Sequence, residues 1–223
     1  MDYPSDRIAD GVPLLYVDAH LVVLDKPAGL LSVPGRGAGK ADCAWSRVQR
    51  QLADALVVHR LDMATSGLLL MARGAAMQRL LSRAFETRQV GKRYLALVDG
   101  HLAAPAAGDG WGLVDLPLAA DWPNRPRQLV DQARGKPSRT RWRVLGFDPE
   151  RQATRLELEP VTGRSHQLRV HLQALGHPIL GDALYAPAAA RERAPRLLLH
   201  ASELRLAHPA TGAPMHWRSA APF

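Results

Sequence analysis

Apolar residues follow two different spacings along the chain, one typical of strands and one typical of helices. Short apolar runs at residues 14–17 and 21–24 are separated and followed by turn residues, which predicts two strands and then a Pro-Gly loop. The apolar run at residues 68–71 predicts a buried strand. Residues 75–89 place apolar side chains at helical spacing with arginines on the remaining surface, which predicts an amphipathic helix.

The second half of the chain opens with a predicted hairpin. Residues 138–147 alternate strictly and a turn leads into the run at 154–161, so two paired strands are expected. One face of the first strand carries three arginines: Arg139, Arg141 and Arg143. These side chains can be solvated, can pair with Glu157 and Glu159 across the hairpin, or can contact RNA.

A capped helix is predicted after the hairpin. Thr162 or Ser165 can cap it, three leucines form its buried stripe, and Gly176 closes it. Residues 103–136 are rich in Pro, Gly, Ala and Arg, which predicts irregular surface structure. Strands outnumber helices and alternate irregularly with them, so the expected fold class is α+β with a mixed, mostly antiparallel sheet flanked by helices and loops.

Length and cysteine content bound the class of protein. The 223 residues suit one large domain spanning 1–223, or a domain with a small appendage, with enough chain to bury a full core. The one cysteine, Cys43, cannot form an intramolecular disulfide, which favours a reducing compartment. The chain starts without a basic region and without a long apolar stretch, so we expect a cytoplasmic protein with no membrane contact, and a monomer by default.

The charge balance points to a polyanionic partner. Twenty-nine basic against 21 acidic residues give a formal net charge of +8, and the pI is near 10.3. All but four of the basic residues are arginine, whose planar fork suits phosphates and base edges. A solvated basic surface without a partner would have the same composition, so charge alone does not decide.

Asp62 lies at the mouth of an apolar run, in the stretch VVHRLDMATSGLLLMAR. Its carboxylate can accept bonds from the backbone N–H of Ala64 or Thr65 in an Asx turn, which is a common use of aspartate. Alternatively, Arg164 in GRSHQLRVH can pair with it and keep it ionised in a partly dry site. A carboxylate held in that way can act as nucleophile or base.

Other chemistries find less support in the chain. Tyr94 suits either a core position or a surface on which an RNA base stacks. His166 and His171 are five residues apart, off the spacing that places two metal ligands on one helical face, so no metal is expected. No Gly-rich phosphate loop is present, so no nucleotide cofactor is expected. Ser66, His59 and Asp62 lie close together in the sequence, as a Ser/His/Asp hydrolase could use them, but Ser66 is not in a G-x-S-x-G elbow, so this hydrolase gains no support.

Four blocks in order, VHRLDMATSGLLLMAR, KRYLALVDG, PVTGRSHQLRVHLQALGHPILGD and RLLLHASEL, resemble the RluA family of RNA pseudouridine synthases. The likeness runs from about Pro13 to Trp217. It implies isomerisation of uridine to pseudouridine without cofactor or metal: the uracil is detached at N1, turned and rejoined through C5. The segment GLVDLPLAADWPNRPRQ is similar to members of dual specificity, which modify 23S-type rRNA and tRNA and lack an N-terminal S4-like RNA-binding domain.

The resemblance also implies roles for single residues. Asp62 matches the catalytic aspartate, Tyr94 the tyrosine that packs on the target uracil, and Arg164 the arginine paired with the aspartate. Arg60 matches a residue that fills the gap left by the flipped base. Leu199 is chosen from the run 197–199 as the apolar wall of the site.

Two further residues are assigned to substrate binding. They are His59, from the HRLD block, and Arg139, from the arginine-bearing strand. A noncatalytic RNA-binding or ribosome-assembly protein on the same scaffold is the first alternative function. A phosphodiesterase or other hydrolase using Asp and His is the second.

Overall fold

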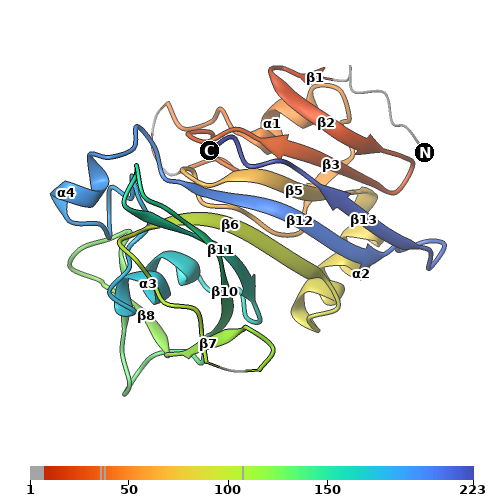
Figure 1. The fold of residues 1–223 in the computed structure, drawn as a ribbon. Coiled ribbons are helices and arrows are strands. Elements are labelled where there is room, and N and C mark those ends of the chain that lie inside the picture. The colour runs from red at the N-terminus through yellow and green to blue at the C-terminus, as the bar shows by residue number, and fades with distance from the viewer. Residues whose placement is uncertain (1–7, 36, 38, 107) are drawn as a thin grey trace. The chain divides into compact units, whose positions relative to one another are not determined.

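The computed structural model describes residues 8–35, 37, 39–106 and 108–223 (Figure 1). The chain divides into two compact units, the first holding residues up to Lys92 together with Ala201–Pro222, and the second holding Arg93–His200 with Phe223. The chain passes from the first unit to the second within β6 (Gly91–Asp99) and returns within β12 (Leu199–Ala207). The expectation about the start of the chain rests largely on residues 1–7, which lie outside the described residues.

The first unit is built on antiparallel strand pairs. Its strands follow the order β1 (Ile8–Ala9), β2 (Val12–Val17), β3 (Leu21–Lys26), β5 (Ser66–Arg73) and β12, while β4 (Ala55–Val57) pairs with β5 and β13 (Pro214–Arg218) pairs with β12. The predicted strands at 14–17, 21–24 and 68–71 are confirmed as β2, β3 and β5. A short helix, α1 (Ala44–Gln49), precedes β4.

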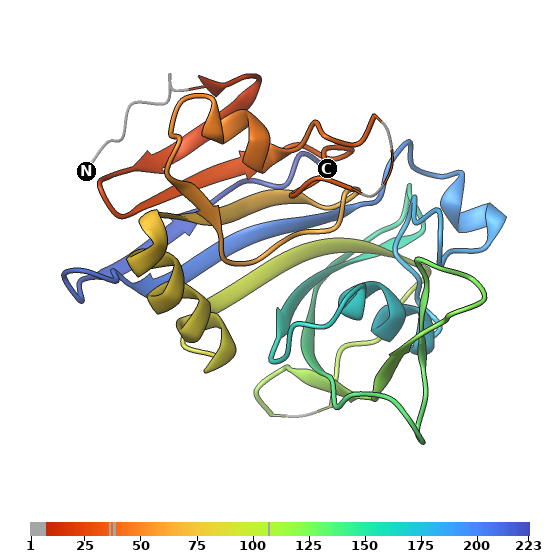
Figure 2. The ribbon, with the colours of Figure 1, turned by 180° about the vertical axis from the view of Figure 1, so that it is seen from behind.

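The core of the first unit lies between these strands and α2 (Gly74–Glu86), which Figure 2 shows on one face of them. Leu81 of α2 is buried in one cluster with Leu70 of β5, Leu204 of β12 and Trp217 of β13. The predicted amphipathic helix is therefore confirmed, because its apolar stripe covers the sheet while its arginines stay outside.

Gly67 is required where β5 meets β12. Its φ is +107°, and a Cβ added there would lie 2.3 Å from the carbonyl oxygen of Ala201. Any side chain would therefore push the two strands apart directly after the Asp62 loop.

The main strands of the second unit neighbour one another in the order β6, β11 (Ala153–Pro160), β10 (Arg139–Asp148) and β7 (Gly112–Asp115), and each of these neighbouring pairs is antiparallel. The predicted hairpin is confirmed as β10 and β11, with Arg141 opposite Glu159 and Arg143 opposite Glu157. The prediction of irregular structure over 103–136 is partly wrong, since β7 and the pair β8 (Leu118–Ala120) and β9 (Gln128–Val130) lie there. Strands of three or four residues are too short to show a period in the sequence.

Helix α3 (Gln167–Ala174) follows the hairpin, and α4 (Ala188–Arg191) lies further along the chain. Gly176, with φ of +82°, closes α3 as predicted. The predicted caps are wrong: the N-cap is His166, in a left-handed conformation with φ of +52°, and it makes no side-chain capping bond. Thr162 instead donates from Oγ1 to Oε1 of Gln167 at 2.7 Å, because Gln167 occupies the first turn with a buried amide.

Nine pairs of strands in the described residues are antiparallel, which confirms the α+β class with its mostly antiparallel sheet. Over the described parts of the chain, no helix has the length and apolar character needed to cross a membrane. Within the same residues, no group of three His, Cys, Asp or Glu side chains is arranged to hold a metal ion.

Candidate active site

Asp62 lies in the first unit, in the loop that leads from β4 into β5, and the end of β3 holds this loop. Lys26, the last residue of β3, has 0% exposed surface. Its ammonium donates to the carbonyl oxygens of Pro27 at 2.9 Å, Leu30 at 2.8 Å and Met63 at 3.1 Å. The N–H of Gly29 donates to the same Met63 oxygen at 2.8 Å. The residue directly after Asp62 is thus fixed by two donors.

The residue directly before Asp62 is fixed as well. Ser32 donates from Oγ to the carbonyl oxygen of Leu61 at 2.7 Å and accepts from the N–H of Leu61 at 3.0 Å. The N–H of Thr65, one donor that an Asx turn would use, donates to the main-chain oxygen of Asp62 at 3.1 Å. Main-chain and side-chain bonds therefore fix the conformation of the loop, in which Asp62 is partly buried.

Lys26 is also an electrostatic neighbour of Asp62. Burial lowers the pKa of Lys26 to about 8, and the negative charge of Asp62 acts in the opposite direction. The amine is therefore still charged at neutral pH, which places a buried cation beside the candidate catalytic carboxylate. Sequence reasoning missed this residue. Its signal was a lysine two residues after the apolar run at 21–24, in LVVLDKP.

His59 anchors the start of the same loop to β5. Its Nε2 accepts the backbone N–H of Leu70 at 2.9 Å, and its ring stacks on Phe85 with centroids 4.4 Å apart. Burial, and then the charge of Lys92, lower the pKa of His59 to about 3, so the ring is neutral and carries its proton on Nδ1. Its role in substrate binding stays a prediction. Arg60, next in the chain, is exposed.

Tyr94 and α3 share one face of the sheet in the second unit. Tyr94 stands opposite Leu158, and Leu158 stands opposite Trp142, so the three side chains lie on the same side. Thr140, two residues before Trp142, contacts α3 through His171 at 2.9 Å. Tyr94 is partly buried there.

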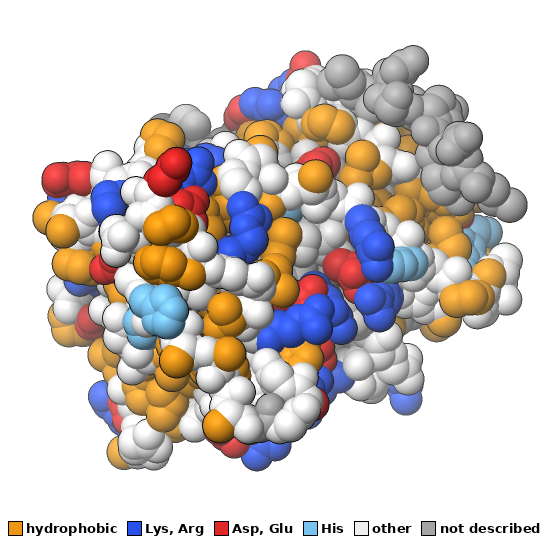
Figure 3. All heavy atoms as spheres, viewed as in Figure 1, with side chains coloured by type: hydrophobic (Ala, Val, Ile, Leu, Met, Phe, Trp, Pro, Cys, Tyr) orange, Lys and Arg blue, Asp and Glu red, His pale blue; other side chains and the backbone are white. Residues whose placement is uncertain are grey.

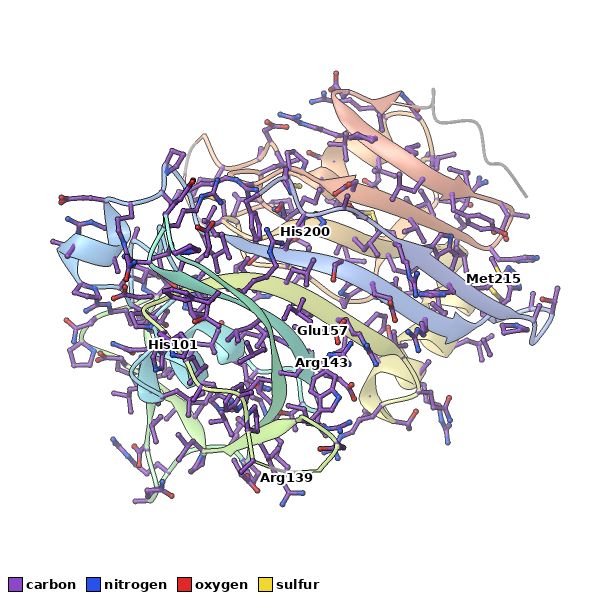
Figure 4. The ribbon with its side chains drawn as sticks, in the orientation of Figure 1. His101, Arg139, Arg143, Glu157, His200 and Met215 are labelled. Atoms are coloured by element: carbon purple, nitrogen blue, oxygen red, sulfur yellow. The ribbon has the colours of Figure 1, made fainter. Side chains whose placement is uncertain are left out.

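The arginines of β10 lie on the opposite face of that sheet, because they alternate with Thr140 and Trp142. Arg139 pairs with Asp115 at 2.8 Å and Arg143 with Glu157 at 2.7 Å, as Figure 4 shows for the second pair. On the side of the molecule viewed in Figure 3, basic and acidic side chains lie interspersed. The ion pairs expected across the hairpin are Arg143 with Glu157 and Arg141 with Glu159, and both are present, the second at 3.8 Å, whereas RNA contact by Arg139 stays a prediction.

A buried glutamine positions the turn that carries Arg164. The Arg164 N–H donates to Oε1 of Gln167 at 3.0 Å, and the Nε2 of Gln167 donates to the carbonyl of Arg139 at 2.9 Å and to Thr140 at 3.0 Å. The Arg164 side chain itself is exposed. Sequence reasoning missed Gln167, because a glutamine in the first helical turn has no distinctive pattern.

A buried ion pair braces the other side of this turn. Arg169 contacts both oxygens of Asp182 at 2.7 Å, and Asp182 has 0% exposed surface. Asp182 also accepts the N–H of Tyr185 at 3.1 Å. The Tyr185 hydroxyl lies 2.7 Å from Nδ1 of His166, two residues after Arg164. A bidentate pair with further bonds to its carboxylate is a rigid support.

Leu199 has only 3% exposed surface, and Leu197 and Leu198 are buried with it. The run is therefore buried, and the choice of Leu199 as the wall of the site stays a prediction. Of the predicted site residues, the first unit holds His59, Arg60 and Asp62, and the second holds Tyr94, Arg139, Arg164 and Leu199.

Known proteins match this chain over most of its length. Residues 20–174 match the family described as RNA pseudouridylate synthase. The chain is 50% identical over 210 residues to the dual-specificity RNA pseudouridine synthase RluA of Yersinia pestis, covering 94% of this chain and 99% of that protein. It is 51% identical to the dual-specificity RNA pseudouridine synthase RluA of Escherichia coli (strain K12), covering 94% of this chain and 93% of that protein.

Solved structures agree with this result. The structure of human RNA pseudouridylate synthase domain containing 1 matches with a TM-score of 0.77 and 27% identity, covering 97% of this chain and 86% of that chain. The structure of human RNA pseudouridylate synthase domain containing 4 matches with a TM-score of 0.71 and 26% identity, covering 94% of this chain and 88% of that chain. The resemblance seen in the sequence motifs is confirmed, and the chain belongs to the RluA family of RNA pseudouridylate synthases.

Proposed function

We propose that this protein isomerises uridine to pseudouridine in structured RNA, and that its substrates are a large-subunit rRNA hairpin and a tRNA anticodon stem-loop. The observation that carries the proposal is the Asp62 loop. Lys26 and Ser32 fix the backbone on both sides of that carboxylate, in a chain that is half identical to dual-specificity synthases.

The reaction breaks the bond between N1 of uracil and C1′ of ribose and forms a bond from C5 to C1′; the C5 proton leaves and N1 takes up a proton, so the composition of the nucleoside is unchanged. Asp62 is the catalytic residue of this proposal, as nucleophile towards base or sugar or as base towards a ribose proton. Arg164 pairs with it, and Tyr94 packs on the uracil. Arg60 and Leu199 complete the substrate site, together with the predicted contacts of His59 and Arg139.

A base within a stem or a stacked loop cannot be reached, so the enzyme must extrude it at a cost of a few kcal/mol. Contacts to phosphates can offset this cost, and the net charge of +8 supports them. We further propose that the protein acts as a monomer in the cytoplasm, as one catalytic domain over 1–223, without cofactor or metal.

Hydrolysis through Ser66 is less favoured by the geometry. His59 accepts the N–H of Leu70 at Nε2, so that nitrogen is occupied by the sheet and is poorly placed to take a proton from a serine. The other alternative is a noncatalytic RNA-binding protein. Replacement of Asp62 should abolish the function of an enzyme but not that of a noncatalytic RNA-binding protein.

The test measures tritium release from RNA labelled at uridine C5, with transcripts of both RNAs and with EDTA present. Wild-type protein should release tritium from both, and Asp62→Asn should lower the rate by roughly 10³-fold or more while RNA affinity is kept. Asp42→Asn, an exposed aspartate of the same unit paired with Arg47, is the matched control and should stay active.

Each other outcome has a definite meaning. Full activity of Asp62→Asn would remove Asp62 from the chemistry. Tight binding without tritium release from either RNA would favour the noncatalytic function, and release from one RNA would narrow the substrate. Cleaved RNA would favour the hydrolase.

A further inference from the structure

The hairpin formed by β8 and β9 ends in an exposed tip that the proposed chemistry does not use. All six residues from 122 to 127, WPNRPR, are exposed. Trp122 has 68% of its surface exposed, the highest value among the exposed large apolar side chains of the described residues. An aromatic ring left in water in this way needs a reason in the surrounding structure.

The tip is ordered by its own bonds. Asp121 receives two bonds from the side-chain amide of Asn124, at 3.0 and 3.1 Å, and the N–H of Asp121 donates to the carbonyl of Arg127 at 3.0 Å. The guanidinium of Arg125 lies 3.3 Å from the centroid of the Trp122 ring. One face of the indole is therefore covered by a cation, and the ring is held at a defined place.

The base of the hairpin is tied to the turn that carries Arg164. The N–H of Gln128 donates to the Tyr185 hydroxyl at 2.8 Å, and that same hydroxyl contacts His166. Arg127 donates to the carbonyl of Leu184. Leu118 and Val130 pack with Tyr185 in one apolar cluster. Within the second unit, Trp122 is thus connected to the Arg164 turn through a short series of bonds rather than through a loose loop.

The chemistry of the tip suits a nucleic-acid base better than a protein. Trp122 is the one large exposed apolar side chain between Leu118 and Val130, a stretch described without gaps, whereas a protein-binding patch needs several apolar side chains side by side. Arg125 lies over the ring, Arg127 is a further exposed arginine of the same tip, and Asp121 accepts from Asn124. A largely exposed flat ring with a guanidinium group on one face offers its other face to an unpaired base.

We propose that residues 121–127 form a second RNA contact, in which an unpaired base of the substrate loop stacks on the open face of Trp122 while Arg125 and Arg127 contact the neighbouring phosphates. A base held there has a fixed relation to the Arg164 turn, so the tip selects RNA loops whose unpaired bases reach it. Selection of substrate rests on the proposed function, while binding of the base does not.

The test uses the full chain and stem-loop transcripts that carry 2-aminopurine at one unpaired position at a time. Binding is measured in the Asp62→Asn background, so that no turnover occurs. Trp122→Ala should raise Kd by about 5- to 150-fold and should abolish the 2-aminopurine quenching at one loop position. Trp122→Phe should keep Kd within about threefold, because a phenyl ring still stacks. Leu145→Ala, an exposed apolar residue of β10, is the matched control and should change neither readout.

Activity then separates the two proposals. With Asp62 restored, Trp122→Ala should raise KM for the stem-loop by a similar factor and leave kcat unchanged. If the wild type makes no pseudouridine but Trp122→Ala still weakens RNA binding, the RNA contact is supported and the proposed function is contradicted. If the wild type makes pseudouridine and Trp122→Ala leaves Kd, quenching and KM unchanged, the RNA contact is contradicted and the proposed function stands.

Discussion

Lys26 carries a charge where no water reaches it. Burying an ammonium is costly, and here three carbonyl oxygens and the nearby Asp62 offset the cost. Lys26→Met keeps the length of the side chain but leaves all three oxygens without this donor. The free energy of unfolding should fall by roughly 2–4 kcal/mol, measured by urea denaturation.

Lys92→Met is the control for this prediction. The Lys92 amine lies 5.9 Å from the centroid of the Phe85 ring, a contact worth about 1 kcal/mol or less. Equal destabilisation by the two substitutions would show that the carbonyl bonds of Lys26 contribute nothing particular.

The residues found from the sequence and those that were missed differ in one physical respect. Asp62 was found because a carboxylate beside an apolar run is conspicuous in any single stretch. Lys26 and Gln167 act through bonds to distant parts of the chain, such as the bond from Lys26 to Met63, 37 residues away. A contact of that kind exists only after folding, so no local pattern announces it.

The turn between β2 and β3 shows how one carboxylate can hold an element. Asp18 accepts from the Tyr16 hydroxyl at 2.7 Å, from the N–H groups of His20 at 2.7 Å and Leu21 at 2.8 Å, and from His208 at 2.8 Å. Burial acts to raise the pKa of Asp18, but these bonds outweigh it and lower the pKa to about 2.

The stability from Asp18 should therefore depend on pH in the acid range. The folded-state pKa lies below the ordinary value of 3.8, so the contribution of about 2 kcal/mol is complete above pH 4 and is lost as the pH falls towards 2. Urea denaturation of wild type and Asp18→Asn from pH 7 to pH 2 measures it. The difference between the two proteins should shrink between pH 4 and pH 2, and a difference independent of pH would contradict the assignment.

Elements with a clear period or a bounded apolar run were predicted, and the shortest strands were not. The amphipathic stripe of α2 and the alternation in β10 each extend over ten or more residues, so burial on one face leaves a readable pattern. The pair β8 and β9 depends on a turn at Trp122–Arg127 and on bonds to Tyr185. The N-cap of helix α3 is His166, which has a left-handed conformation. The sequence offered the common capping residues Thr162 and Ser165 nearby, so the prediction favoured them.

At the scale of the whole molecule, charge should govern the affinity for RNA. The count of 29 basic residues overstates what is available to phosphates, because several arginines are already paired with carboxylates, including those of β10; the net charge of +8 already takes these carboxylates into account. We still expect the affinity for a stem-loop RNA to fall roughly 100-fold or more between 50 and 200 mM salt, as phosphate contacts are lost. Filter binding at several salt concentrations measures the slope, and a flat profile would show that phosphates are not the main contact.

The class of fold and the family were within reach of the sequence, but the division into two units was not. A boundary between domains is usually visible as a linker rich in Pro, Gly or polar residues. Here the chain crosses between the units inside β6 and β12, whose apolar residues look like any other strand. The composition of the chain therefore carries no sign of the division.

The burial of Lys26 has a practical consequence for chemical labelling. The chain has four lysines, of which Lys40 and Lys136 are exposed and Lys92 is partly exposed. An amine-acylating reagent should modify those three readily, and should reach Lys26 only when the loop around Asp62 opens. The rate at which mass spectrometry detects acylated Lys26 would then measure that opening, and RNA that stabilises the loop would slow it. Acylation of Lys26 in the native protein would therefore report how often the candidate active site opens.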